Sequence, residues 1–139
     1  PNGRPLTIVG DGPQKEFLQN MAGGNIRCLG HLPNDRLPEI YERHDVFILP
    51  SLYEPWGLVV EEALFRGLPV IASDKVGSAA DMVTALETGA VFSLAAPDGL
   101  SNAIHEVEEN YETMARRVAD INWNGRVEAQ LKAYTSLLD

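Results

Sequence analysis

The sequence is poor in cysteine, histidine and basic residues, and each shortage excludes a class of function. The single cysteine, Cys28, has no partner for an internal disulfide and suits a reducing compartment such as the cytosol. Three histidines without a Cys or His pair at ligand spacing indicate no metal site. Because 11 basic residues stand against 20 acidic ones, giving a net charge of −9, we expect no nucleic-acid-binding surface.

Long hydrophobic runs are also absent. No apolar run approaches the roughly 20 residues that a membrane-spanning helix needs, and no signal peptide is visible. The chain begins with Pro1 instead of Met, which favours a piece of a longer protein. Its 139 residues, 45% hydrophobic and 22% charged, predict one globular domain over residues 1–139.

Short apolar runs alternate with helical patterns along most of the chain. The expected strands are Pro5 to Val9, Ile26 to Leu29, Asp45 to Ser51, a run from Pro69 and Thr88 to Phe92. The expected helices are residues 14–21, a stretch capped by Asn34 or Asp35 and running to Arg43, one that opens near Gly57, one from Asp98, and a last one carrying Val127, Leu131, Tyr134 and Leu138. This alternation predicts an α/β fold, with a Rossmann-like parallel sheet and helices on both faces.

The most informative stretch is residues 50–73, PSLYEPWGLVVEEALFRGLPVIAS. Pro55 biases Glu54 away from helical backbone angles, so we expect this acid on an extended lip just before the helix. The first turn of that helix offers N–H groups without intrahelical partners, and such a turn attracts phosphate. Helical side chains tilt toward the N-terminus, so Glu62 should lean back toward this turn, while Glu61 is expected on the more exposed side. The pattern therefore predicts a site for a ligand with phosphates and sugar hydroxyls.

The run E-P-W-G-L-V-V-E-E-A-L, followed by G-L-P-V-I-A-S, resembles the E-x7-E motif of retaining glycosyltransferases with the GT-B fold. The resemblance is to the family-4-like group, glycosyl transferases group 1, which includes capsule, lipopolysaccharide and glycogen-synthase-type enzymes. It implies that Glu54 contacts hydroxyls of the donor sugar and is the catalytic candidate, and that Glu62 holds the ribose. The remaining residues that it implies in the donor-binding segment are Trp56, Gly57, Leu58 and Val59.

Three further loop residues are less clearly assigned. The resemblance places His31 beside the nucleotide base, and a solvated loop histidine is an equal alternative. For Tyr53 we expect loop packing, with a ligand or partner-domain contact as the alternative. For Lys75 we expect solvation in preference to a phosphate contact.

Two glycine-containing turns depart from familiar patterns. Many relatives read Gly-Gly-x-Pro-Glu where this chain has residues 77–81, Gly-Ser-Ala-Ala-Asp, so Asp81 is a candidate helix-start acceptor in place of Glu. The turn Gly-Asp-Gly-Pro at residues 10–13 lacks the third glycine of a dinucleotide fingerprint, because that place is Lys15. An NAD site is therefore disfavoured.

The resemblance implies the donor-binding domain of an enzyme that transfers a sugar from a nucleoside diphosphate sugar to a hydroxyl acceptor with retained configuration. It implies no metal and no cofactor beyond this substrate, and a cytoplasmic role in polysaccharide or glycolipid biosynthesis, compatible with a membrane-associated acceptor at the inner face. Relatives also carry an N-terminal acceptor domain and, in this domain, an earlier strand and helix with a basic diphosphate clamp. Without them we expect the chain to be inactive alone.

In the usual strand order, 3-2-1-4-5-6, the missing strand would lie in the middle of the sheet. We therefore expect one of three outcomes: strands two and four close on each other, a strand is exchanged with another copy, or stability is marginal. Two other functions stay open. One is a GT-B sugar-nucleotide epimerase or phosphorylase, and the other is a non-catalytic α/β interaction module.

Overall fold

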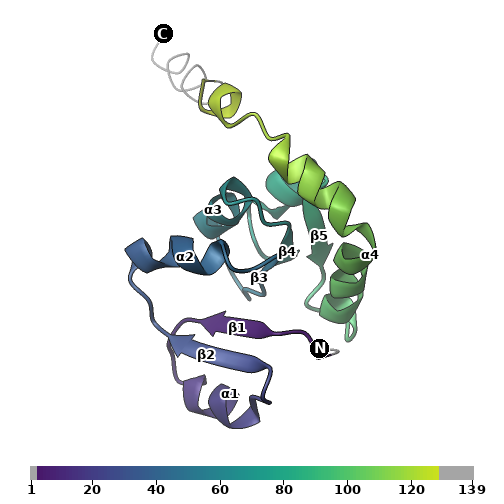
Figure 1. Ribbon diagram of the computed structural model, residues 1–139. Coiled ribbons are helices and arrows are strands. Elements are labelled where there is room, and N and C mark those ends of the chain that lie inside the picture. Colours follow the sequence, from purple (N-terminus) through teal and green to yellow (C-terminus); the bar gives the residue numbers. More distant parts are fainter. Residues whose placement is uncertain (1–2, 129–139) are drawn as a thin grey trace. The chain divides into compact units, whose positions relative to one another are not determined.

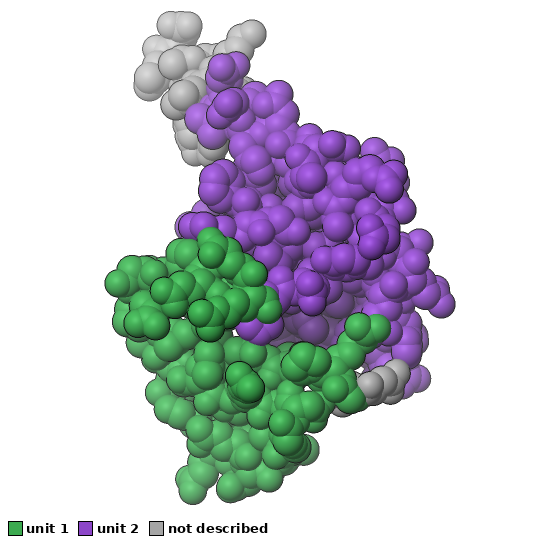
Figure 2. Space-filling view, viewed as in Figure 1, with its two compact units in different colours: residues 1–43 green, residues 44–139 purple. Residues whose placement is uncertain are grey.

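The computed structural model describes residues 3–128, and the chain divides into two compact units, residues 1–43 and residues 44–139 (Figures 1 and 2). Residues 123–128 are helical, which agrees with the start of the expected last helix. The rest of that expected helix, including Leu131, Tyr134 and Leu138, lies outside the described residues. The expectation of one domain stays a prediction.

The first unit is a parallel pair of strands with two small helices. Its elements are β1 (Leu6–Val9), α1 (Lys15–Met21), β2 (Ile26–Gly30), the 3₁₀ turn η1 (Asn34–Arg36) and α2 (Leu37–Tyr41). Leu6 lies opposite Ile26 in the ladder. No side chain caps η1 or α2, so the expected cap from Asn34 or Asp35 is wrong.

Helix α1 forms where its apolar spacing predicts, but its apolar side chains are not buried. Phe17 is 58% exposed and Met21 67% exposed. Two strands of four and five residues offer little surface to cover a helix, because a unit of this size buries a small share of its area. The expected helix over residues 14–21 is therefore confirmed, and its apolar side chains are exposed.

The second unit is a three-stranded parallel sheet covered on both faces. Its elements are β3 (Phe47–Leu49), α3 (Leu58–Phe65), β4 (Val70–Ser73), η2 (Ala79–Thr84), β5 (Gly89–Phe92) and α4 (Gly99–Ala119). The strand order is β3-β4-β5, and Ile48, Ile71 and Ala90 lie side by side in register. Every residue of the central strand β4 is buried.

Helix α4 covers one face of this sheet and packs against it (Figure 1). Ile71 and Phe92 from the sheet join one buried cluster with Val107 and Met114 from the helix. Fully burying a side chain of this size contributes roughly 1.5–3 kcal/mol, so the contact is a major source of stability. Elements α3 and η2 contact strand β4 as well, and the predicted α/β fold with parallel strands is confirmed.

Element η2 is a π-helical turn, whereas the sequence predicted only a glycine-containing turn with a helix start at Asp81. Its wide turns are closed by the Ala85 N–H donating to the Ala80 carbonyl at 2.9 Å and the Thr88 N–H donating to the Val83 carbonyl at 3.1 Å. The buried Thr88 hydroxyl also donates to the Met82 carbonyl at 2.6 Å. Because these bonds span five and six residues, neither α-helical periodicity nor a capping pattern predicts them.

The strands form two sheets, β1-β2 and β3-β4-β5. The expected closure of strand two on strand four, which are β1 and β3 here, stays a prediction. Strand exchange between copies and marginal stability stay predictions.

Asp74 links the end of β4 to the turn that follows β5. The Ser93 hydroxyl donates to Asp74 Oδ2 at 3.0 Å, and the Leu94 N–H donates to Oδ1 at 3.4 Å. The hydrogen bond from Ser93 is the main reason that the pKa of Asp74 lies below its ordinary value. Desolvation opposes this shift, and the Leu94 N–H and Lys75 add to it. The carboxylate therefore favours the folded state.

We predict that Gly89→Ala will destabilise the second unit by at least about 2 kcal/mol, because a side chain there forces backbone apart. A Cβ at Gly89 would lie 1.8 Å from the Val70 carbonyl oxygen, across the β4-β5 ladder. Gly24→Ala is the matched control, since nothing lies within 4 Å of its Cβ position. Urea unfolding followed by circular dichroism measures both, and equal midpoints would contradict the packing of β4 on β5.

We also predict that Asp74 contributes to the stability of the folded state and that this contribution is lost at acidic pH. Because folding lowers its pKa, its stabilisation is present above the ordinary titration range of aspartate, about pH 4, and is lost as the pH falls through the lower folded pKa. Asp74→Asn should therefore flatten the acid limb of a plot of unfolding midpoint against pH, and Ser93→Ala should flatten it in part. Identical acid limbs in the wild type and Asp74→Asn would refute this role.

Candidate functional site

The turn that carries Glu54 is fixed by backbone hydrogen bonds to the turn after β4. The Glu54 N–H donates to the Lys75 carbonyl at 3.1 Å, and the Glu54 carbonyl accepts from the Gly77 N–H at 2.9 Å. The Trp56 carbonyl accepts from the Ser78 N–H at 2.9 Å. Glu54 and Val76 thereby form a parallel bridge outside the named strands. The backbone of Glu54 is therefore hydrogen-bonded through both its N–H and its carbonyl group.

Gly77 makes this approach of the two turns sterically feasible. A Cβ at this position would lie 2.0 Å from the Pro55 carbonyl oxygen and 3.3 Å from the Trp56 Cα. Real Cβ atoms do not approach backbone atoms so closely, so any other residue at position 77 would push the turns apart. The steric role of Gly77 was not predictable from the sequence, because it depends on the approach of a second turn.

Gly57 begins α3 with left-handed backbone angles, φ 90° and ψ 62°. A Cβ there would lie 3.2 Å from Glu54 Cγ and 3.0 Å from Val76 Cγ1, so the glycine is needed for its angles and for space. Glu54 is half-buried against this start of the helix. The N–H groups of Leu58 and Val59, in the first turn, have no carbonyl partner within the helix. The structure thus brings Glu54 and the positive end of α3 together.

The two acids on α3 have the reverse of the expected exposure. Glu61 is half-buried, and its Oε1 accepts a hydrogen bond of 2.8 Å from Trp56 Nε1. Glu62 is the exposed one, about 6 Å along the axis from Leu58. The expectation that Glu61 is the more exposed is therefore wrong, because it ignored the indole of Trp56. Glu54 thus lies before the start of α3, while Glu62 lies about one turn into the helix, in its second half.

An open depression of about 640 Å³ lies beside the Glu54 turn. Tyr53 lies at its wall and is 80% exposed, so the expected loop packing of this residue is wrong. Lys75 is exposed, and its Nζ lies 3.6 Å from Asp74 Oδ2. The lining comprises Tyr53, Glu54, Pro55, Asp74, Lys75, Val76, Gly77, Ala79, Ala80, Thr84 and Val91.

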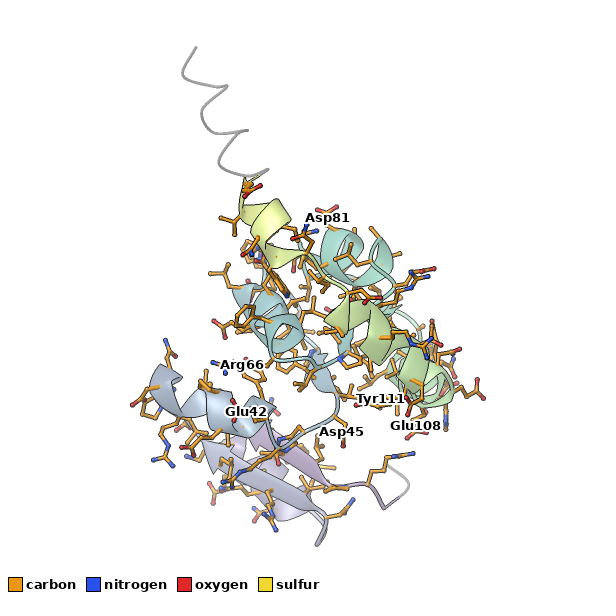
Figure 3. The ribbon with its side chains drawn as sticks, turned by 45° about the horizontal axis from the view of Figure 1, so that its top comes forward. Glu42, Asp45, Arg66, Asp81, Glu108 and Tyr111 are labelled. Atoms are coloured by element: carbon orange, nitrogen blue, oxygen red, sulfur yellow. The ribbon has the colours of Figure 1, made fainter. Side chains whose placement is uncertain are left out.

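The start of η2 contains a buried hydroxyl without a partner. Ser78 is fully buried, its Oγ forms no hydrogen bond, and it lies 3.5 Å from the Cβ position of Gly57. Asp81, labelled in Figure 3, is exposed on η2, and no side chain caps this element. Asp81 therefore does not act as the expected helix-start acceptor.

His31 belongs to the first unit, residues 1–43. It is exposed and follows Gly30 at the end of β2. Nearby, the Lys15 ammonium donates to Asp11 Oδ2 at 3.1 Å, and the Gly12 N–H donates to Oδ1 at 2.9 Å. These two bonds are the main reason that the pKa of Asp11 lies below its ordinary value, and His31 adds a small contribution. A base contact by His31 stays a prediction.

Two negative findings concern the described residues. Within residues 3–128, no three His, Cys, Asp or Glu side chains are grouped closely enough to hold a metal ion. None of the helices in this part of the chain combines the length and hydrophobicity that crossing a bilayer requires.

Residues 2–121 match the family described as glycosyl transferases group 1. Glycogen synthase of Mycobacterium tuberculosis is 30% identical over 145 residues, covering 95% of this chain and 35% of that protein. A GDP-mannose-dependent alpha-mannosyltransferase of the same organism is 36% identical over 117 residues, covering 81% of this chain and 30% of its own length.

The fold is similar to solved glycosyltransferase structures. Sucrose-phosphate synthase from Thermosynechococcus elongatus superposes with a TM-score of 0.68 at 24% identity, covering 99% of this chain and 46% of that chain. This likeness shows a GT-B-type Rossmann-like fold. The chain spans about one third of the length of the curated relatives above. The family match covers most of the chain, and the chain therefore belongs to the family of glycosyl transferases group 1.

Proposed function

We propose that this chain is the donor-binding part of a retaining, metal-independent glycosyltransferase. The intact enzyme transfers a sugar from a nucleoside diphosphate sugar to a hydroxyl acceptor in polysaccharide or glycolipid biosynthesis, at the cytoplasmic side. A separate acceptor-binding domain completes the enzyme. The named relatives, a glycogen synthase and a mannosyltransferase, support this reaction class.

The observation that carries the proposal is the contact between Glu54 and the start of α3. Glu54 Cγ lies 3.2 Å from the Cβ position of Gly57, so a hydrogen-bond acceptor stands beside the positive end of a helix. Hydroxyls of the donor sugar bind the Glu54 carboxylate, and the diphosphate binds the N–H groups of Leu58 and Val59. Glu62, exposed on the same helix, binds the ribose hydroxyls.

The chemistry of this arrangement is positioning and charge stabilisation. As the sugar leaves, negative charge grows on the diphosphate, and oriented backbone N–H groups stabilise it without reorganisation. Transfer on one face of the sugar needs no protein nucleophile, and Glu54 orients the reacting sugar. The net charge of −9 opposes an anionic donor at long range, so these local donors have to supply the attraction.

We predict that isothermal titration calorimetry will detect binding of at least one of UDP, GDP and ADP with a dissociation constant of about 1 mM or lower. Glu62→Ala should weaken this binding about tenfold or more, because the ribose loses a charge-assisted acceptor. Glu109→Ala, an exposed acid on α4, is the control and should leave it unchanged.

EDTA should not alter the affinity, because backbone N–H groups bind the diphosphate in place of a metal. Absence of binding by all three nucleotides would support the non-catalytic interaction module over the proposed donor site. Unchanged affinity in Glu62→Ala would remove this residue from the site.

We predict that Gly77→Ala will abolish the preference for a nucleotide sugar over its diphosphate. The added Cβ meets the Pro55 carbonyl and displaces the turn that carries Glu54, while the amides of α3 stay in place. UDP-glucose, GDP-mannose and ADP-glucose are compared with UDP, GDP and ADP by calorimetry. Glu54→Gln should give the same loss of preference, about fivefold or more.

Circular dichroism and an unfolding curve establish that Gly77→Ala is folded before its binding is interpreted. An unchanged preference in both variants would show that Glu54 does not contact the sugar. If Glu54→Gln keeps the wild-type preference and Gly77→Ala loses it, the position of the turn is the source of selectivity and the carboxylate is excluded.

A further inference from the structure

The side-chain hydrogen bond between Trp56 and Glu61 joins the acid-bearing turn to the helix behind it. The indole N–H of Trp56 donates to Glu61 Oε1 at 2.8 Å, a length typical of a charge-assisted hydrogen bond. The two residues lie on different elements, Trp56 before the start of α3 and Glu61 within it. The bond therefore fixes a side chain of the turn relative to the helix.

Trp56 is held at its backbone as well as at its ring. Its carbonyl accepts the Ser78 N–H, and its indole nitrogen is bonded to Glu61. The side chain is still 43% exposed. Because the one polar atom of the ring is already paired, the area left to solvent is mainly apolar aromatic carbon.

An exposed aromatic side chain normally samples several rotamers, and binding a ligand then costs the entropy of choosing one. A side chain already fixed in the unbound protein avoids this cost. The C–H face of a sugar ring is flat and apolar, so a fixed aromatic surface suits it, and Trp56 is two residues from the carboxylate assigned to sugar hydroxyls.

We propose that Glu61 is a positioning residue that holds Trp56 as a preorganised aromatic surface for the sugar ring of the donor. This inference rests on the proposed donor-binding function. It gives the two adjacent acids of α3 different tasks, since Glu62 faces the ribose while Glu61 acts on the sugar only through the indole. Glu61 itself does not touch the ligand.

The first test follows the indole without any ligand. Trp123→Phe leaves Trp56 as the sole tryptophan, and it preserves an aromatic ring for the edge contact with Phe65, at 5.6 Å between centroids. In this background, Glu61→Leu should lower the fluorescence anisotropy of Trp56 and raise acrylamide quenching roughly twofold, because the anchor is lost. Glu61→Gln keeps an acceptor oxygen and should restore most of the wild-type signal.

Glu109→Leu, which removes an exposed acid from α4, is the control and should change neither signal. Unfolding curves show that each variant is folded. Equal anisotropy and quenching in the wild type and Glu61→Leu would overturn the positioning role.

The second test adds the donor. In the wild type, UDP-glucose, GDP-mannose or ADP-glucose should change Trp56 fluorescence more than the corresponding diphosphate does. Glu61→Leu should weaken binding of the sugar nucleotide about fivefold and leave binding of the diphosphate unchanged. Glu61→Gln should keep most of the wild-type affinity for the sugar nucleotide. Equal weakening for both ligands would overturn the contact with the sugar ring.

The two tests separate the inference from the function on which it rests. If none of these nucleotides or nucleotide sugars binds the wild type, the proposed function and the sugar contact fail together. The ligand-free anisotropy then still decides whether Glu61 fixes Trp56.

Discussion

The proposed donor site depends on the backbone hydrogen bonds that join the Glu54 turn to the turn after β4. These bonds involve the main-chain atoms of Glu54 and Trp56 on one side and of residues 75–78 on the other. Gly77 permits the contact because it has no Cβ. A carboxylate on a free loop would sample many positions, whereas this one begins from a fixed backbone and needs only its own side-chain torsions to be set.

The sheet explains why these two turns meet. Strands β3 and β4 are parallel neighbours, so the segments that follow them emerge at the same edge, where ligands bind in open α/β sheets. Strand β4 is buried throughout and α4 packs across one face, which fixes that edge. Helix α3 then starts at Gly57, between the two strands in the chain, and directs its positive end to the place where Glu54 lies.

Patterns with a strong local cause were predictable from the sequence. Buried β4, the start of α3 after Gly57 and the long amphipathic α4 all formed as expected, because apolar periodicity and glycine act locally. Features that depend on individual side-chain bonds or irregular backbone bonds were not predictable. The π-helical η2 depends on the bonds of Thr88 to Val83 and Met82, and the partial burial of Glu61 accompanies a hydrogen bond from the Trp56 indole.

Because main-chain hydrogen bonds hold the Glu54 turn, some exposed side chains around it can be changed in protein design. Tyr53 and Leu58 expose substantial surface to solvent, 80% and 67%, while the backbone hydrogen bonds that hold the turn do not use their side chains. These two positions can therefore be randomised together without disturbing the scaffold beneath them. Libraries confined to this pair, with Trp56 and the glycines at 57 and 77 kept constant, offer a route to altered selectivity at the proposed donor site.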